Sequence, residues 1–119
     1  MGPHHKKSDL QKKKDHFLKL YKSWNKVYCP ALKADVHFTN YAWLHLVKDK
    51  YRTGKETLRR LEVLPLAKKL IEKSGTIQHK RFHKGRVHYE FQADMDGRII
   101  RVVIFDNWGK FTFKTWFIV

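Results

Sequence analysis

The last third of the chain, residues 76–119, constrains the fold most, because its side chains alternate between apolar and polar with a period of two. Such alternation is typical of a β-strand with one face in a core and the other in solvent. Asp96-Gly97 is a favoured two-residue hairpin turn, and residues 106–109 form a second turn signal. The pattern predicts an antiparallel meander of three to four strands, at 76–82 (the weakest), 86–94, 98–105 and 110–119.

The lengths of the two turns predict which side chains share a face of this sheet. With two residues in the first turn and four in the second, one face is almost wholly apolar and forms the core. A three-residue second turn would bring Lys114 into the core, which is costly, so four residues are preferred. In this register Thr115 lies on the core face. The outer face then carries His88, Glu90, Gln92, Arg101, Val103, Phe105, Thr112, Lys114 and Trp116.

The first two thirds of the chain show helical spacing instead. Apolar residues predict a helix over 9–27, a second from Thr39 or Asn40 to residue 51, and a third over 56–73 that is kinked or broken at Pro65. A short extended segment is expected at 36–38. Together these elements predict an α+β fold, with N-terminal helices packed on one face of the C-terminal antiparallel sheet. Residues 1–8 are expected to form a flexible basic tail, and residues 9–119 a single domain.

Charge sets the class of partner. The chain has 26 Lys and Arg against 11 Asp and Glu, a formal net charge of +15. Such a protein is attracted to polyanions: nucleic acid, an anionic membrane or an acidic protein. A solubilising surface is the alternative explanation. No apolar run is long enough to span a bilayer, so membrane insertion is not expected.

Metal and cofactor chemistry has little support in the sequence. Cys29 is the single cysteine, which excludes an internal disulfide and a zinc site built on paired cysteines. His79, His83 and His88 are close in sequence, but no carboxylate pair accompanies them. No glycine-rich phosphate loop is present. We therefore expect neither a metal nor an organic cofactor.

The outer sheet face carries the residue types that metal-free RNA cleavage requires. A base must deprotonate the 2′-hydroxyl and an acid must protonate the leaving oxygen, roles that His88 or Glu90 can fill. Arg101 and Lys114 can hold the phosphate, and Trp116 can stack on a base. The competing explanation is that strand alternation alone places polar residues on a half-exposed face.

A second cluster is expected on the predicted helix at 39–51, where four side chains fall within about 60° of one another. A histidine, a phenol and two cations on one helix face suit a phosphate site. An ordinary basic surface with a partly buried histidine explains the pattern equally well. The sequence leaves open whether this cluster and the sheet face meet in one cleft. The four residues are Tyr41, His45, Lys48 and Arg52.

The element order over residues 36–119 resembles the BECR superfamily, which covers barnase, EndoU, colicin D and RelE-like ribonucleases. The resemblance is carried by Val36-His37-Phe38-Thr39, by His45 in the following helix, and by strands that end in Lys114-Thr115-Trp116-Phe117. It is strongest for small phage and contact-dependent toxins. The lysine-rich segment before residue 36 lies outside the shared pattern.

The resemblance implies a site built from a helical histidine, basic residues and a Ser or Thr near the last strand. Here these would be His45, Arg52 and Thr115, with Arg101 and Lys114 binding phosphate. The preferred register conflicts with this, since it turns Thr115 toward the core; either the last strand is bulged near Thr115 or the analogy fails there. The resemblance also implies action in the cytoplasm, in some members after delivery from another cell, and an acidic immunity or antitoxin partner.

The function predicted from these patterns is a metal-independent endoribonuclease, a toxin that cleaves RNA such as tRNA or mRNA by 2′-hydroxyl attack. The main alternative is a non-catalytic RNA- or DNA-binding module that uses the same basic aromatic face. A third is a domain that binds proteins or membrane surfaces through charge alone.

Overall fold

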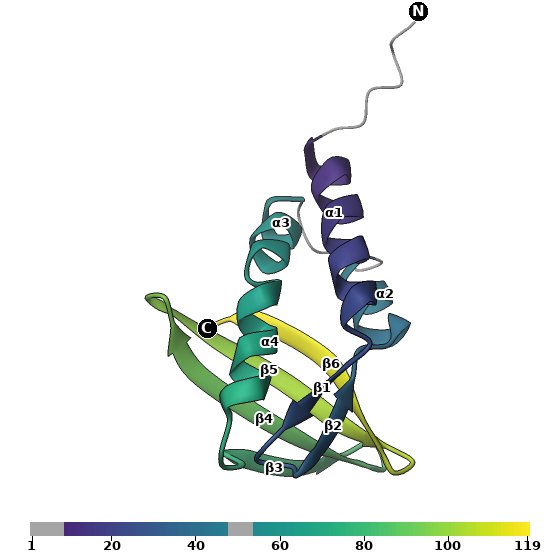
Figure 1. Ribbon diagram of the computed structural model, residues 1–119, viewed down its shortest axis with the longest axis vertical. Coiled ribbons are helices and arrows are strands. Elements are labelled where there is room, and N and C mark those ends of the chain that lie inside the picture. Colours follow the sequence, from purple (N-terminus) through teal and green to yellow (C-terminus); the bar gives the residue numbers. More distant parts are fainter. Residues whose placement is uncertain (1–8, 48–53) are drawn as a thin grey trace, which may run out of the picture.

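The computed structural model describes residues 9–47 and 54–119, and in this part of the chain it contains four helices and six strands (Figure 1). The predicted tail at 1–8 and the end of the second predicted helix lie outside the described residues. In chain order the elements are α1 (Asp9–Trp24), β1 (Lys26–Cys29), β2 (Ala34–His37), α2 (Asn40–Val47), α3 (Gly54–Glu62), α4 (Leu64–Lys73), β3 (His79–His83), β4 (Arg86–Met95), β5 (Arg98–Asn107) and β6 (Lys110–Ile118).

All six strands form one sheet in the order β1-β2-β6-β5-β4-β3. The α+β class is confirmed, and the predicted C-terminal antiparallel meander is present as β3 to β6, but the sheet has more strands than predicted and is not purely antiparallel. The extra strands are β1 and β2, and β2 pairs in parallel with β6 at His37 and Thr112. Residues 26–27, predicted as helix, belong to β1. Helix α1 ends at Trp24 because Asn25 adopts a left-handed backbone conformation, with φ 55°.

The break predicted at Pro65 is confirmed as two separate helices. α3 ends at Glu62, and α4 begins at Leu64 with Pro65 in its first turn. Proline fits there because the first turn of a helix has no partner for the missing N–H. Helix α3 begins at Gly54, two residues before the predicted start of the third helix at residue 56.

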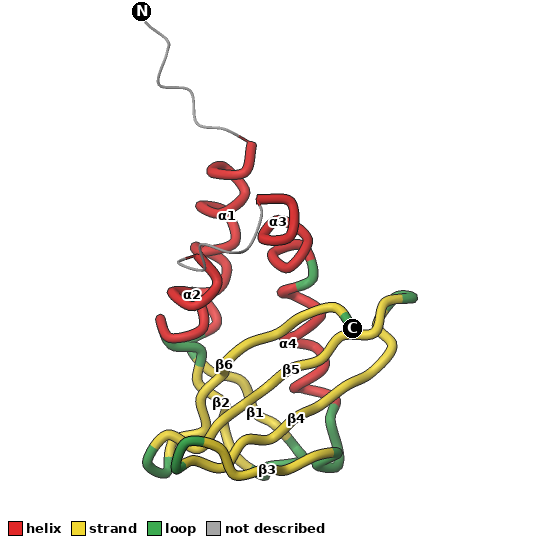
Figure 2. Tube along the Cα trace, turned by 180° about the vertical axis from the view of Figure 1, so that it is seen from behind, coloured by secondary structure: helices red, strands yellow, loops and turns green. Residues whose placement is uncertain are grey.

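Helix α4 crosses β4 and β5 on one face of the sheet, while α1 stands beside α3 (Figure 1). Figure 2 shows the same strands from behind, with α4 on their far side. The core lies between α4 and the sheet and continues under α1 and α2. Burial of this apolar surface is the main stabilising contribution, roughly 25 cal/mol per Å². Its largest fully buried side chains include Tyr21, Leu61, Leu64, Ile71, Phe91, Ile100, Ile104, Phe113 and Trp116.

The register of the last two strands corrects the sequence prediction. The Asp96-Gly97 turn is confirmed, since Met95 faces Arg98. The second turn contains only Trp108-Gly109 rather than four residues, because Asn107 pairs with Lys110.

The ladder then shifts by one residue between Val103 and Ile104 of β5, so β6 carries a β-bulge at Lys114. The shift places Thr115 opposite Val103 and Trp116 opposite Val102. The prediction that Trp116 lies on the outer face is therefore wrong. Its side chain is fully buried, and its indole Nε1 donates a hydrogen bond to the backbone oxygen of Arg60 at 2.7 Å.

Candidate nucleic-acid interface

The sheet face opposite α4 holds a groove of three connected hollows, of about 400, 420 and 260 Å³. The first two hollows share His79, Glu90 and Arg101, and Lys114 joins the second to the third. Five side chains that line them are Lys or Arg, and Glu90 is the one carboxylate among the lining residues. An elongated concave surface of this charge suits a polyanion. The cations are Arg81, Lys84, Arg86, Arg101 and Lys114.

A direct contact between His88 and Lys114 lies near the centre of the groove. The lysine Nζ is 2.8 Å from Nε2 of the imidazole. Nδ1 lies 3.1 Å from the backbone oxygen of Arg86, and because a carbonyl only accepts, Nδ1 carries the proton. Nε2 of the neutral ring is then the acceptor, and the Lys114 ammonium is the donor. A single proton therefore occupies the short contact.

Burial and neighbouring charge perturb both members of this pair. Burial lowers the pKa of His88, and the positive charges of Lys114, Arg81 and His83 lower it further, against the hydrogen bond to the Arg86 carbonyl. Burial also lowers the pKa of Lys114, with Arg81 and Lys84 acting in the same direction. Perturbed titratable groups in a concave site are typical of functional residues.

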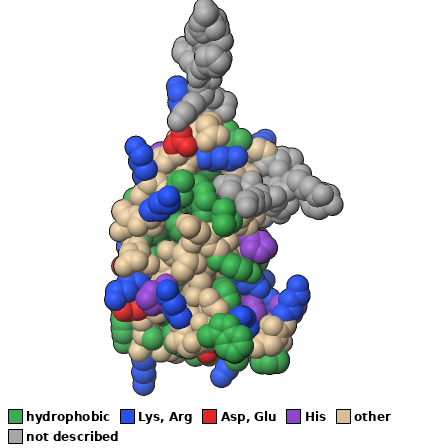
Figure 3. Space-filling model, turned by 90° about the vertical axis from the view of Figure 1, so that its right-hand side faces the viewer, with side chains coloured by type: hydrophobic (Ala, Val, Ile, Leu, Met, Phe, Trp, Pro, Cys, Tyr) green, Lys and Arg blue, Asp and Glu red, His purple; other side chains and the backbone are tan. Residues whose placement is uncertain are grey.

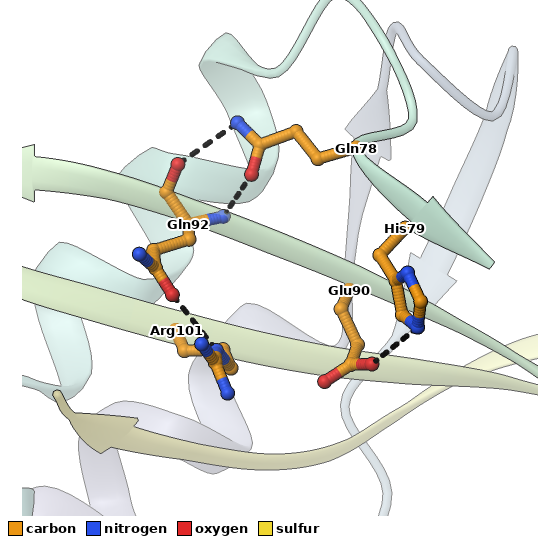
Figure 4. A pocket seen from close by; sticks show the side chains of 5 residues that line it. All are labelled: Gln78, His79, Glu90, Gln92 and Arg101. Carbon is orange, nitrogen blue, oxygen red and sulfur yellow. Dashed lines mark hydrogen bonds and ion pairs between the residues drawn. The ribbon is translucent and has the colours of Figure 1, made fainter. Parts of the chain in front are cut away.

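Glu90 lies two residues from His88 on the same face of β4, about 7 Å along the strand. Its carboxylate is held by two neighbours on β3, Arg81 Nε at 3.3 Å and His79 Nε2 at 3.6 Å. Only 16% of the Glu90 side chain is exposed, so the ion pair to Arg81 and the contact with His79 orient it inside the groove. Figure 4 shows Glu90 and His79 pointing toward each other from adjacent strands.

Arg101 lies where the first two hollows of the groove meet, and a relay of amides orients it. Its Nε donates to Oε1 of Gln92 at 2.8 Å. The backbone N–H and oxygen of Gln92 are in turn both bonded by the side chain of Gln78, at 2.7 and 2.8 Å (Figure 4). The relay occupies Nε and fixes the guanidinium plane, whose terminal nitrogens suit phosphate binding.

The bulge in β6 brings Lys114 and Thr115 into the same hollow. This resolves the conflict over Thr115, whose hydroxyl accepts a hydrogen bond from Arg60 Nη2 at 2.6 Å. Because that contact uses only an oxygen lone pair, the hydroxyl proton stays available to a ligand. Arg60 itself comes from α3 and stacks over the buried ring of Trp116, with 5.2 Å between its Cζ and the ring centre.

The helix cluster and the sheet cluster meet through Tyr41. Its ring lies 5.2 Å from that of Phe105 on β5 and 5.1 Å from that of His45 on α2, between ring centres. Phe105 in turn stacks on His88 at 5.8 Å. Tyr41 also lines the third hollow together with His88 and Lys114. His45 is therefore at the rim of the groove, whereas Lys48 and Arg52 lie outside the described residues.

Sequence reasoning missed the contribution of the β3–β4 hairpin. His79, Arg81 and His83 alternate along β3 and face the groove, and Lys84 and Arg86 follow at the turn. The sequence does indicate this face, because cationic and imidazole side chains stand at every second position of the strand that the sequence predicts most weakly. In the side view of Figure 3, Lys, Arg and His side chains recur over the part of the molecule formed by the sheet, and Asp and Glu are few.

Comparison of the chain with protein families, curated proteins and solved structures finds no match. Within residues 9–47 and 54–119, no helix has the length and apolar character needed to cross a bilayer. In the same ranges, no three His, Cys, Asp or Glu side chains lie close enough together to hold a metal ion. The groove geometry is thus the basis for a functional assignment.

Proposed function

We propose that this protein is a metal-independent endoribonuclease that cleaves RNA by attack of a 2′-hydroxyl on the adjacent phosphodiester. The observation that supports this most directly is the position of Glu90. It is the one carboxylate among the residues that line a basic groove, and the Lys114–His88 pair lies close by. A base, a proton donor and phosphate-binding cations are what this reaction requires.

In the proposed reaction, Glu90 accepts the proton of the 2′-hydroxyl as the bond between that oxygen and phosphorus forms. The ion pair to Arg81 and the contact with His79 hold the carboxylate in place. Arg101 binds a non-bridging phosphate oxygen, and the Thr115 hydroxyl donates to another. Charge that builds on the phosphate is stabilised in a partly enclosed site, where such contacts are stronger than in water.

Lys114 then protonates the leaving 5′-oxygen as the bond between phosphorus and that oxygen breaks. Its lowered pKa makes it a better acid than an exposed lysine, and the Nε2 lone pair of His88 orients it. The products are a 2′,3′-cyclic phosphate and a 5′-hydroxyl end. His45, the base implied by the BECR resemblance, remains a second candidate base at the rim, through its contact with Tyr41.

The resemblance adds a biological role to this proposal. A small RNase of this type would act as a toxin on RNA such as tRNA or mRNA, and its producer would need an inhibitor. With a net charge of +15, the complementary inhibitor is an acidic immunity or antitoxin protein that covers the groove.

The test is incubation of the purified protein with total RNA in excess EDTA, followed by analysis of the product ends. We expect cleavage with cyclic phosphate ends, lowered about 10²- to 10⁴-fold by Glu90→Gln. Glu72→Gln is the matched control, because it removes a comparable ion pair, that to Lys68 on α4, outside the groove. Equal rates for wild type and Glu90→Gln would reject the assigned base.

A non-catalytic RNA-binding module is the second candidate, and the burial of His88 favours it. The side chain is 2% exposed and its Nε2 is occupied by Lys114, so the ring does not reach a 2′-hydroxyl directly. In that case RNA would bind in a salt-dependent manner and be recovered intact from the same incubation.

A further inference from the structure

Two of the three two-residue hairpin turns in the described part of the chain share an aspartate cap, and their two-residue loops, Asp96-Gly97 and Trp108-Gly109, differ at one position. In each turn an aspartate accepts a hydrogen bond from the glycine N–H three residues later, Asp94 to Gly97 at 2.9 Å and Asp106 to Gly109 at 2.6 Å. Both residues of each two-residue loop have positive φ, near 56° and then 82–89°. Asn, Asp and Gly are favoured at such positions.

The first turn obeys that preference with Asp96, and the second carries Trp108, at the same φ of 56°. A bulky aromatic residue is disfavoured in the left-handed region. The Trp108 side chain gains no compensating burial, since it is 88% exposed, the highest value among the large hydrophobic residues that are exposed. The turn would form at least as well with Asp or Asn. The requirements of folding therefore do not explain this tryptophan.

The surroundings of Trp108 indicate what the ring binds. Arg86 lies over it, with 4.7 Å between the guanidinium carbon and the ring centre, and donates to Oδ1 of the neighbouring Asn107 at 2.7 Å. Arg86 and Asn107 also line the third hollow of the groove, together with Lys84 and Lys114. The ring thus lies at the mouth of the basic groove, at the end of the sheet where the β3–β4 and β5–β6 turns are neighbours (Figure 2).

We propose that Trp108 and Arg86 form a stacking platform for an unpaired nucleobase of single-stranded RNA, one end of which enters the groove. The inference rests on the proposed RNA-binding function and extends it to a base-binding subsite and a preference for unpaired strands. A flat ring with a planar cation beside it binds any base through its π face, so the platform recognises an unstacked base rather than a particular sequence. A base in a duplex is already stacked and does not reach it.

The test measures affinity for a 2′-O-methyl RNA of about eight nucleotides, which resists 2′-hydroxyl attack and so separates binding from cleavage. A set of the same strands carries one abasic residue at each position in turn. For wild-type protein, we expect one position at which the missing base weakens binding about 5- to 100-fold. Trp108→Asn should weaken binding of the intact strand by a similar factor. The affinity of this variant should be the same for the intact strand and for the strand that is abasic at that position.

Two controls keep the result interpretable. Phe82→Ala removes another exposed aromatic residue, 74% exposed, which pairs with Val87 on β4 and does not line the groove, and it should leave all affinities unchanged. Trp108→Asn should show a thermal midpoint at or above that of wild type, because Asn suits the turn. A lower affinity in this variant is then not a folding defect.

The outcomes distinguish the subsite from the nuclease. Intact RNA in the cleavage assay together with the expected abasic effect would reject the nuclease and retain the platform. Cleavage together with equal affinities for wild type and Trp108→Asn would retain the nuclease and overturn the platform. An abasic penalty that persists unchanged in Trp108→Asn would also overturn it, because the sensitive base would then bind elsewhere.

Discussion

The amine of Lys114 lies 2.8 Å from the imidazole Nε2 of His88, and the two groups share one proton at the centre of a basic groove. The two residues are far apart in sequence. β4 supplies the imidazole and β6 supplies the lysine, and β5 lies between these strands in the sheet. Both side chains line the third hollow together with Phe105, whose ring stacks on that of His88.

Stability should fall as pH decreases below about 6.5, the ordinary pKa of histidine. The pKa of His88 is lowered in the folded state, so below pH 6.5 the unfolded chain binds more protons than the folded chain. The free energy of unfolding therefore decreases, by at most about 1.4 kcal/mol per pH unit for one group. Urea unfolding at pH 7.5 and pH 5 measures the slope. His88→Gln should reduce it without abolishing it, because the pKa of His37 is lowered too. An unchanged slope in the variant would contradict this assignment.

Trp116→Phe should destabilise the fold by about 2 kcal/mol, since it removes a buried hydrogen bond to the Arg60 carbonyl and leaves a gap in the core. Urea unfolding measures the loss. Trp108→Phe is the matched control, because its ring is exposed, and it should cost little. The RNA affinity of folded Trp116→Phe should equal that of wild type. A large loss of affinity would instead show that Trp116 takes part in RNA binding.

The affinity for single-stranded RNA should fall steeply with salt, and Arg101→Gln should make that dependence shallower. Each lost phosphate contact reduces the slope of log affinity against log salt concentration by about 0.7. Lys69→Gln removes an exposed charge on α4 and should change the slope little. If both variants reduce the slope equally, binding is spread over the whole surface rather than concentrated in the groove.

Tyr21→Phe should cost about 1 kcal/mol at neutral pH, because the buried hydroxyl donates a hydrogen bond to the Thr39 oxygen at 2.6 Å. The pKa of Tyr21 is raised by burial. Above about pH 10 the unfolded chain therefore loses this proton first, and stability falls with rising pH. Denaturation at pH 8 and pH 10.5 tests this, and the variant should show a smaller decrease. An equal decrease would assign the alkaline loss to other groups, such as Tyr89, whose pKa is also raised.

The sequence predicted the hairpin of β4 and β5 because local signals agreed there. Alternation over Val87–Ala93 and the Asp96-Gly97 turn each imply the same register, and the ladder follows it. His88, Glu90 and Arg101 were placed on the correct face for that reason. The break of the helix at Pro65 could be predicted equally well, since the effect of proline on the backbone is local.

The errors arose where distant contacts decide the structure. The apolar spacing of the first helix runs on to residue 27 and obscures the start of β1, whose pairing with β2 selects an extended chain. The residue pattern around Lys114-Thr115 did not locate the bulge, which entered only as one of two ways to reconcile the predicted register with the BECR resemblance. The meeting of Tyr41 with Phe105 depends on how α2 docks on β6, which no local spacing encodes.

The bulge also changes what a deletion would do. Removal of one residue from a paired strand normally turns every following side chain to the opposite face. Here Phe113 and Trp116 both face the core, with two residues between them. A chain that lacks Lys114 would therefore form an uninterrupted ladder, with Thr115 as the single outward residue between Phe113 and Trp116. Loss of one codon would thus preserve the fold and remove the groove's central amine. The irregularity is one inserted residue in an otherwise regular sheet, and the sheet does not need it.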